Sequence, residues 1–104
     1  MKIEEMVEFF RSLCPIAYRS FPEGGTPTLP YFVYFVDGDT TFRADGKVYE
    51  EWPDITLELY TEEKDFALEN KIKQYFEENE IVYEHYENYV SSEKMLKNTF
   101  EFTL

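Results

Sequence analysis

Two segments of the chain alternate between apolar and polar side chains, which limits it to folds that contain a half-buried β-sheet. In residues 55–60, one isoleucine and two leucines share a face, and the residues between them share the other. Residues 96–104 alternate in the same way, with Asn98 as the exception on the apolar face. Because successive side chains of a strand point to opposite faces of a sheet, each segment predicts a strand with one covered face.

Further extended segments are predicted earlier in the chain. Residues 31–36 are a continuous run of aromatic and β-branched residues, typical of a strand covered on both faces. Asp37-Gly38 follows and favours a hairpin turn, so residues 40–43 are predicted to return as the next strand. Residues 16–21 predict a short extended segment before these.

The remaining extended segments are less regular. Asp45-Gly46 predicts a second turn, after which residues 48–51 are extended until Pro53 ends the strand. Residues 81–90 have the composition of a strand, but their alternation slips near His85. That slip predicts a β-bulge or an irregular segment.

Two amphipathic helices are predicted. The first spans residues 2–13, and the second follows Thr61 as its N-cap and ends at Asn79 in a left-handed conformation. On the second helix, Glu69 and Lys73 are predicted to form a favourable i,i+4 ion pair. The apolar stripes are Ile3, Met6, Val7, Phe10 and Leu13 in the first helix and Leu68, Ile72, Tyr75 and Phe76 in the second.

These elements together predict an α+β fold, an antiparallel β-sheet with two amphipathic helices packed on one face. An apolar sheet face has to be covered, and two apolar helix stripes are available to cover it. The length of 104 residues suits one domain, so residues 1–104 are interpreted as a single α+β domain.

The net charge excludes several classes of partner. Lys and Arg total 10 and Asp and Glu total 22, which gives −12 at pH 7. Nucleic-acid affinity comes mainly from basic side chains that neutralise phosphates, so we expect no specific nucleic-acid binding and no binding to anionic membranes. With a single cysteine there is no internal disulfide, and the charged first residues do not resemble a signal peptide, so we expect an intracellular protein.

No residue pattern predicts catalysis, a cofactor or a metal. His85 is the only histidine, and Ser91 and Ser92 lack the context of a nucleophile, so His85 is interpreted as structural. Cys14 is interpreted as a buried apolar residue rather than a reactive thiol. Enzymatic activity is therefore not expected.

Three aspartates invite comparison with a calcium loop. Counted from Asp37, the position where an EF-hand loop needs glycine holds Phe42, so that match fails. A looser site that joins Asp37, Asp39 and Asp45 stays open at this point. The competing interpretation is that Asp-Gly pairs serve the backbone of turns.

A loop rich in proline and glycine spans residues 22–30. Its first part, which we interpret as a candidate contact loop, consists of Pro22, Glu23, Gly24, Gly25, Thr26 and Pro27. Such loops are often mobile and can become ordered on binding, although a plain connector would have the same composition.

Several motifs, taken in order, resemble a family of small proteins encoded in tailed phages and prophages of Gram-positive bacteria. They are Pro30-Tyr31-x-x-Tyr34, Phe42-x-Ala44-Asp45-x-x-x-Tyr49, Leu57-x-Leu59-Tyr60-Thr61-x-x-Lys64-Asp65, Ser92-Glu93-x-Met95 and Phe100-x-Phe102. The chain resembles tail-completion or tail-terminator proteins. This resemblance implies a small α+β subunit that forms a ring, expected to be hexameric, at the head-proximal end of the tail tube. It implies no catalytic residue and no cofactor.

The resemblance also implies partners and a location. The expected partners are other copies of the chain, tail-tube proteins and head-neck proteins, first in the host cytoplasm and then in the virion. In such a ring, Asp37, Asp39 and Asp45 are candidates for acidic groups that face the DNA channel and repel DNA, with Glu77-Glu78 as an alternative. The same acids could instead solvate the outer surface. Two other functions stay open: a head-completion or neck adaptor protein, and an acidic DNA mimic that inhibits a DNA-binding enzyme.

Overall fold

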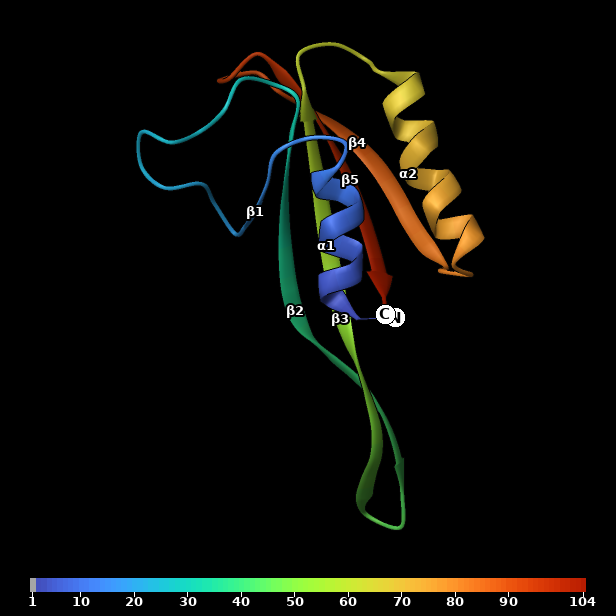
Figure 1. Cartoon of the computed structure of the whole chain (residues 1–104). Coiled ribbons are helices and arrows are strands. Elements are labelled where there is room, and N and C mark those ends of the chain that lie inside the picture. The colour runs from blue at the N-terminus through green and yellow to red at the C-terminus, as the bar shows by residue number, and fades with distance from the viewer. Residues whose placement is uncertain (1) are drawn as a thin grey trace.

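The chain is described over residues 2–104 by a computed structural model and has an α+β fold (Figure 1). Its elements in chain order are α1 (Ile3–Arg11), β1 (Ile16–Tyr18), β2 (Tyr31–Ala44), β3 (Lys47–Thr61), α2 (Phe66–Glu78), β4 (Tyr83–Val90) and β5 (Met95–Thr103). The strands form one five-stranded sheet in the order β1-β2-β3-β5-β4. The predicted α+β class is confirmed.

The sheet is mixed, so the prediction of a purely antiparallel sheet is wrong. β1 pairs with β2 in parallel, with Ile16 opposite Phe32, whereas the other neighbouring strands are antiparallel. The physical reason is the long loop of residues 19–30, which carries the chain back along the sheet before β2 begins. β1 has only 3 residues, too few for the sequence pattern to reveal its direction.

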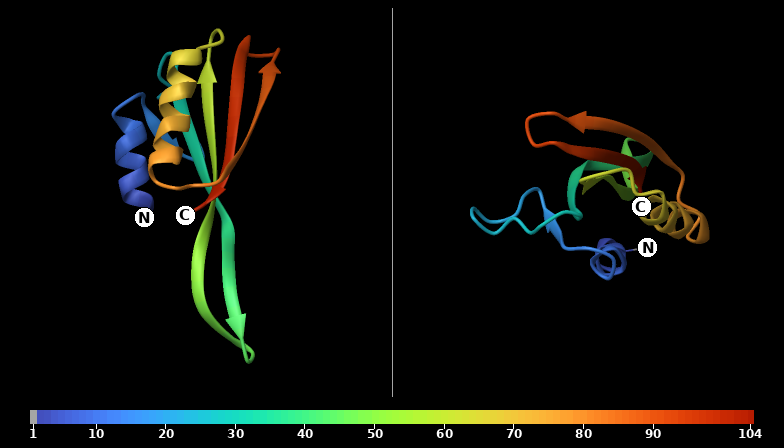
Figure 2. Two further views of the ribbon diagram at one scale, coloured as in Figure 1. Left: turned by 90° about the vertical axis from the view of Figure 1, so that its right-hand side faces the viewer. Right: turned by 90° about the horizontal axis from the view of Figure 1, so that it is seen from above.

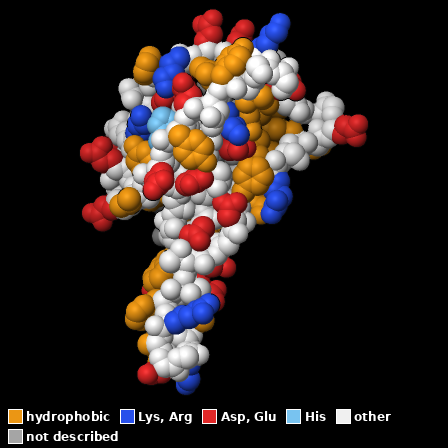
Figure 3. All heavy atoms as spheres, turned by 180° about the vertical axis from the view of Figure 1, so that it is seen from behind, with side chains coloured by type: hydrophobic (Ala, Val, Ile, Leu, Met, Phe, Trp, Pro, Cys, Tyr) orange, Lys and Arg blue, Asp and Glu red, His pale blue; other side chains and the backbone are white. Residues whose placement is uncertain are grey.

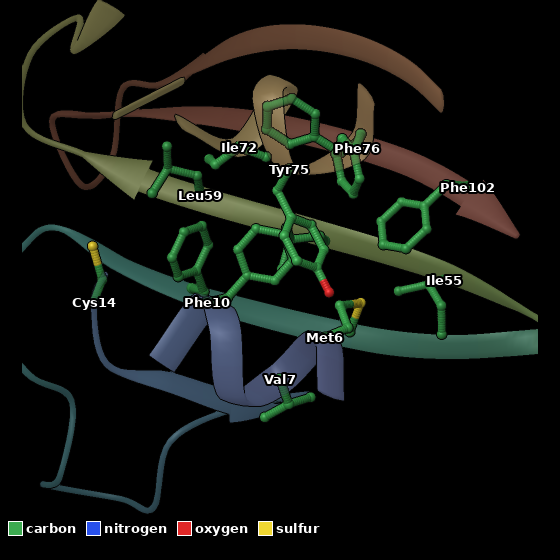
Figure 4. Packing of buried hydrophobic residues seen from close by; sticks show 13 residues of the cluster. Met6, Val7, Phe10, Cys14, Ile55, Leu59, Ile72, Tyr75, Phe76 and Phe102 are labelled. Carbon is green, nitrogen blue, oxygen red and sulfur yellow. The ribbon is translucent and has the colours of Figure 1, made fainter. Parts of the chain in front are cut away.

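Both helices cover the same face of the sheet, as predicted (Figure 2). Phe10 of α1 lies at the centre of the core, and its ring centroid is 5.3 Å from Phe32 of β2 and 6.0 Å from Phe76 of α2 (Figure 4). The apolar faces of β3 and β5 form the sheet side of the core. Leu57 and Phe100 lie directly opposite each other on this face, and both are fully buried. Neither helix within residues 2–104 is long and apolar enough to cross a membrane.

The ends of α2 differ from the prediction. Thr61 is the last residue of β3, and the N-cap is Asp65, whose carboxylate accepts a hydrogen bond from the Leu68 amide at 3.0 Å. Asn79 ends the helix with a φ of −102°, and Glu80 takes the left-handed conformation with a φ of 55°. The Asn79 amide instead donates to the Tyr75 carbonyl, which satisfies a helix-end acceptor.

β2 and β3 form one long hairpin rather than two short ones. Asp37-Gly38 is not a turn: β2 continues through it, with a register shift between Val36 and Gly38. The only turn of the hairpin is Asp45-Gly46. Pro53 does not end β3, because it lies one residue outside the pairing with β5, where a proline is tolerated. Its carbonyl still accepts a hydrogen bond from the Leu104 amide at 3.0 Å.

β4 is also more regular than predicted. It pairs with β5 without a shift from Tyr83 opposite Phe102 to Val90 opposite Met95. The predicted bulge near His85 is therefore wrong. His85 and Glu87 interrupt the apolar alternation because they take part in a polar cluster described below, not because the backbone is irregular.

Candidate functional site

The outer part of the long hairpin projects away from the packed body, and we call its residues 38–53 the hairpin arm (Figures 1 and 2). β3 has partners on β5 only from Asp54 onward, and β2 has partners on β1 only up to Tyr34. The strands of the arm therefore pair only with each other, and no helix covers them. The molecule measures 50 Å along its longest axis against 31 and 24 Å along the others.

Large apolar side chains lie exposed on the arm. They are Phe42, Val48, Tyr49 and Trp52, with exposed fractions of 55%, 49%, 57% and 37%. Phe42 and Trp52 share a face, because Trp52 lies opposite Thr40 and side chains two residues apart in a strand point the same way. The ring centroids of Phe42 and Tyr49 are 6.2 Å apart. The arm thus carries apolar surface that its own chain does not bury.

Hydrogen bonds fix the base of the arm to the body. Asp54 accepts one from Thr40 of the arm at 2.8 Å and one from Thr103 of β5 at 2.6 Å. Both bonds lower the pKa of the Asp54 carboxyl, and the bond from Thr103 is the larger cause. Thr56 donates to the Asp37 carboxylate at the register shift. The arm is therefore held in a defined direction where it leaves the body.

The three candidate aspartates all lie on this hairpin, but they are spread along it. Asp37 lies at the base, Asp39 lies opposite Pro53, and Asp45 is in the turn at the tip with a φ of 54°. Residues 2–104 contain no group of three or more His, Cys, Asp or Glu side chains placed to hold a metal ion. The role of these acids in a channel wall stays a prediction, because it concerns an assembled ring.

The candidate contact loop leaves the body on the side of β1 (Figure 1). Pro22 to Thr26 are exposed and Pro27 is half-buried. The loop is tied to the sheet just before this stretch, where the rings of Phe21 and Tyr31 meet edge to face with centroids 5.3 Å apart. Glu77-Glu78, the alternative acidic site, is exposed at the end of α2.

A buried polar cluster lies between α2 and the β4 edge of the sheet, and the sequence analysis missed it. Glu69 is only 2% exposed and pairs with Lys64 instead of Lys73, so the predicted pair is wrong. The Glu69 carboxylate accepts a hydrogen bond from Lys64 at 2.8 Å, and Lys64 donates at the same distance to Glu87 of β4. One ammonium group thus joins the helix to the edge strand.

The rest of this cluster involves the only histidine. His85 Nε2 is 2.7 Å from Asn98 Oδ1 and 4.0 Å from Glu69 Oε1, and its ring stacks on Phe100 with centroids 4.4 Å apart. Ser91 follows six residues later, just after the end of β4, roughly 20 Å away at the rise of a strand. The cluster therefore has the groups of a structural ion-pair network, and Ser91 lies well outside it.

Cys14 lies at the other end of the core and is 6% exposed. Burial is the main factor that raises the pKa of its thiol, with a further contribution from Asp65 that Lys71 opposes. A raised thiol pKa keeps the sulfur protonated at neutral pH and therefore weakly nucleophilic. This agrees with the interpretation of Cys14 as a core residue.

The charges of the cluster predict a stability effect for Lys64→Met. The variant leaves the Glu69 carboxylate buried without its cation, so we expect the free energy of unfolding at pH 7 to fall by about 1–3 kcal/mol. Lys64 is a third exposed, which favours the lower end of that range. Urea denaturation measures the effect, and Lys71→Met, which changes an exposed lysine of α2, is the control and should change little.

The pH dependence has a definite sign. Hydrogen bonds to Glu69, the larger cause, and to Glu87 raise the pKa of Lys64. The stability that this ammonium group contributes is therefore present below the ordinary lysine pKa of about 10.4 and is lost at higher pH. The bond from Lys64 lowers the pKa of Glu87, so that contribution is present above about pH 4.3 and is lost as pH falls further. The difference between wild type and Lys64→Met should thus shrink below about pH 4. A difference that stays constant from pH 7 to pH 3 would contradict the assignment.

Comparison with family models, with curated proteins and with solved structures finds no match to this chain in any of the three.

Proposed function

We propose that the protein is a structural subunit of a tailed-phage particle, a tail terminator or tail-completion protein that forms a ring at the head-proximal end of the tail tube. The observation that carries the proposal is the hairpin arm with its exposed Phe42, Val48, Tyr49 and Trp52 (Figure 3). A two-stranded hairpin is at best marginally stable by itself in water. The arm therefore has the form of a contact element that another protein chain covers.

The resemblance to tail-completion proteins supports this use of the arm. One of the motifs that carry it, Phe42-x-Ala44-Asp45-x-x-x-Tyr49, forms the tip of the arm, and both of its aromatic side chains are exposed. Aromatic residues are enriched at protein interfaces and supply much of their binding energy. The motif thus coincides with the part of the chain best suited to contact a neighbour.

Ring formation needs more than one contact surface on each subunit, and the arm offers one. A ring of identical subunits needs two different surfaces on each subunit, which fit each other and close by rotation. The arm extends the molecule along its 50 Å axis and so reaches beyond the outline of the body. A surface at the end of such an extension can contact a neighbouring subunit without a steric clash between the two packed bodies.

Deletion of the gene from the phage or prophage that carries it tests the proposal. A tail terminator stops growth of the tail tube, so its loss should give tubes of uncontrolled length that carry no heads, as seen by negative-stain electron microscopy. Loss of a head-completion or neck adaptor protein would instead give tails of normal length beside unjoined heads. Particles that assemble normally without the gene would refute both roles.

A further inference from the structure

The base of the arm borders an open groove of about 910 Å³. It runs between the α2–β4 turn, the ends of β4 and β5, and the point where the arm leaves the body. Five acidic residues line it, Asp37, Asp54, Glu80, Glu84 and Glu101, and none of the described lining residues is a lysine or arginine. Ile81 and Val82 add apolar surface, and Val82 is 90% exposed. The groove is thus acidic with an apolar part.

The tip of the arm, residues 42–49, differs in charge from the groove: it carries two basic side chains and one acidic one, Asp45, a net charge of +1. Arg43 and Lys47 flank the Asp45-Gly46 turn, and neither makes an ion pair with any residue that the structure describes. Exposed apolar side chains lie directly beside them, above all Phe42 and Tyr49. In a chain with 10 basic residues against 22 acidic ones, a tip with a net charge of +1 and exposed aromatic rings fits an acidic, partly apolar groove.

We propose that the arm tip of one copy docks into this groove on the next copy. The tip cannot reach the groove of its own chain, because the groove lies at the base of the arm and Ala44 is about seven residues, roughly 20 Å, farther out along a paired strand. The contact is therefore between copies. Because the tip and the groove are different surfaces, repeated head-to-tail contacts of this kind can close a ring. This inference rests on the proposed function and identifies the partner of the arm.

Disulfide trapping between two single-cysteine variants tests the contact. In a Cys14→Ala background, Ala44→Cys places a thiol at the arm tip and Val82→Cys places one in the groove. Mixed in a glutathione redox buffer, this pair should form the mixed dimer about tenfold faster than the control pair of Ala44→Cys with Ser91→Cys, because docking raises the effective concentration of the thiols. Ser91 lies in the β4–β5 turn, at the end of β4 away from the groove.

Charge reversal gives a second measurement on the same pair. Glu80→Lys with Glu84→Lys in the groove chain should lower the trapping rate to that of the control. Arg43→Glu with Lys47→Glu in the arm chain should then restore it. High salt should slow trapping of the original pair, since exposed charges are screened.

Equal trapping rates for the Val82 and Ser91 pairs would overturn the inference. The proposed function is tested separately by the tail phenotype of the gene deletion. If the deletion leaves tubes of uncontrolled length and the trapping rates are equal, the chain is a terminator whose arm binds some other surface.

Discussion

Chains that carry Phe42→Ser and Trp52→Ser will fold like the wild type and will fail to complete tails. Both side chains lie on one face of the arm, outside the core, so their loss removes no packing from the body. At the centre of an interface, truncation of a large aromatic residue costs about 2 kcal/mol or more. Two such losses together would weaken association roughly a thousandfold.

Complementation of the gene deletion measures this effect as the yield of infectious particles, and circular dichroism with thermal melting checks that the variant is folded. The matched control is Phe66→Ser with Tyr89→Ser, which removes two aromatic rings that are 69% and 60% exposed on the body. The control should complement normally. Full complementation by the arm variant would contradict the role of the arm.

Phe100→Ala will lower the free energy of unfolding by about 3–5 kcal/mol, the range for removal of a large buried aromatic side chain. Phe100 is fully buried, and it packs against Phe76 of α2 with ring centroids 5.8 Å apart while His85 stacks on it. The variant therefore leaves a cavity where helix, sheet and polar cluster meet. Leu57→Ala, directly opposite in the sheet, should cost about 2–5 kcal/mol for the same reason.

Urea denaturation followed by far-UV circular dichroism measures these losses. Phe66→Ala is the control for Phe100→Ala, since Phe66 is 69% exposed in the first turn of α2. This surface change also removes the contact of the Phe66 ring with the Lys64 ammonium group, 5.0 Å from the ring centroid, so its cost stays within about 1 kcal/mol. If both phenylalanine variants lost stability equally, the assignment of Phe100 to the core would be wrong.

The regular part of the fold was predictable because one physical constraint dominates there. The alternation in residues 55–60 and the helical spacing of the stripe around Phe10 each identify one face that must be buried. Nothing competes with burial in these segments, so pattern and structure agree.

The arm was not predictable in this way because the Asp-Gly dipeptide occurs twice and forms a turn only once. Asp37-Gly38 and Asp45-Gly46 both favour a hairpin turn, yet the chain turns only at the second and passes through the first with a register shift. Which pair turns depends on how far β2 and β3 pair with each other, a long-range property. The prediction that Pro53 ends a strand was wrong for a related reason. Its effect depends on whether β5 pairs with β3 at that position.

The polar cluster did leave a signal in the sequence. Glu69 lies three residues before Ile72 and seven before Phe76, which places it within the buried stripe of α2. Asn98 was the exception on the apolar face of β5, and His85 marked the apparent slip in β4. These three polar residues stand at positions that the apolar patterns of α2, β4 and β5 would bury. This indicates that they meet one another, because buried polar groups need partners.

Cryo-electron microscopy of isolated tail tubes, mixed with purified protein, tests the central claim most directly. The account predicts a ring of subunits at one end of each tube, the end that meets the head, with the hairpin arm of each subunit in contact with its neighbour. The Phe42→Ser, Trp52→Ser variant should leave these ends bare. Tubes without added density, or subunits bound along the whole length of the tube, would contradict the account.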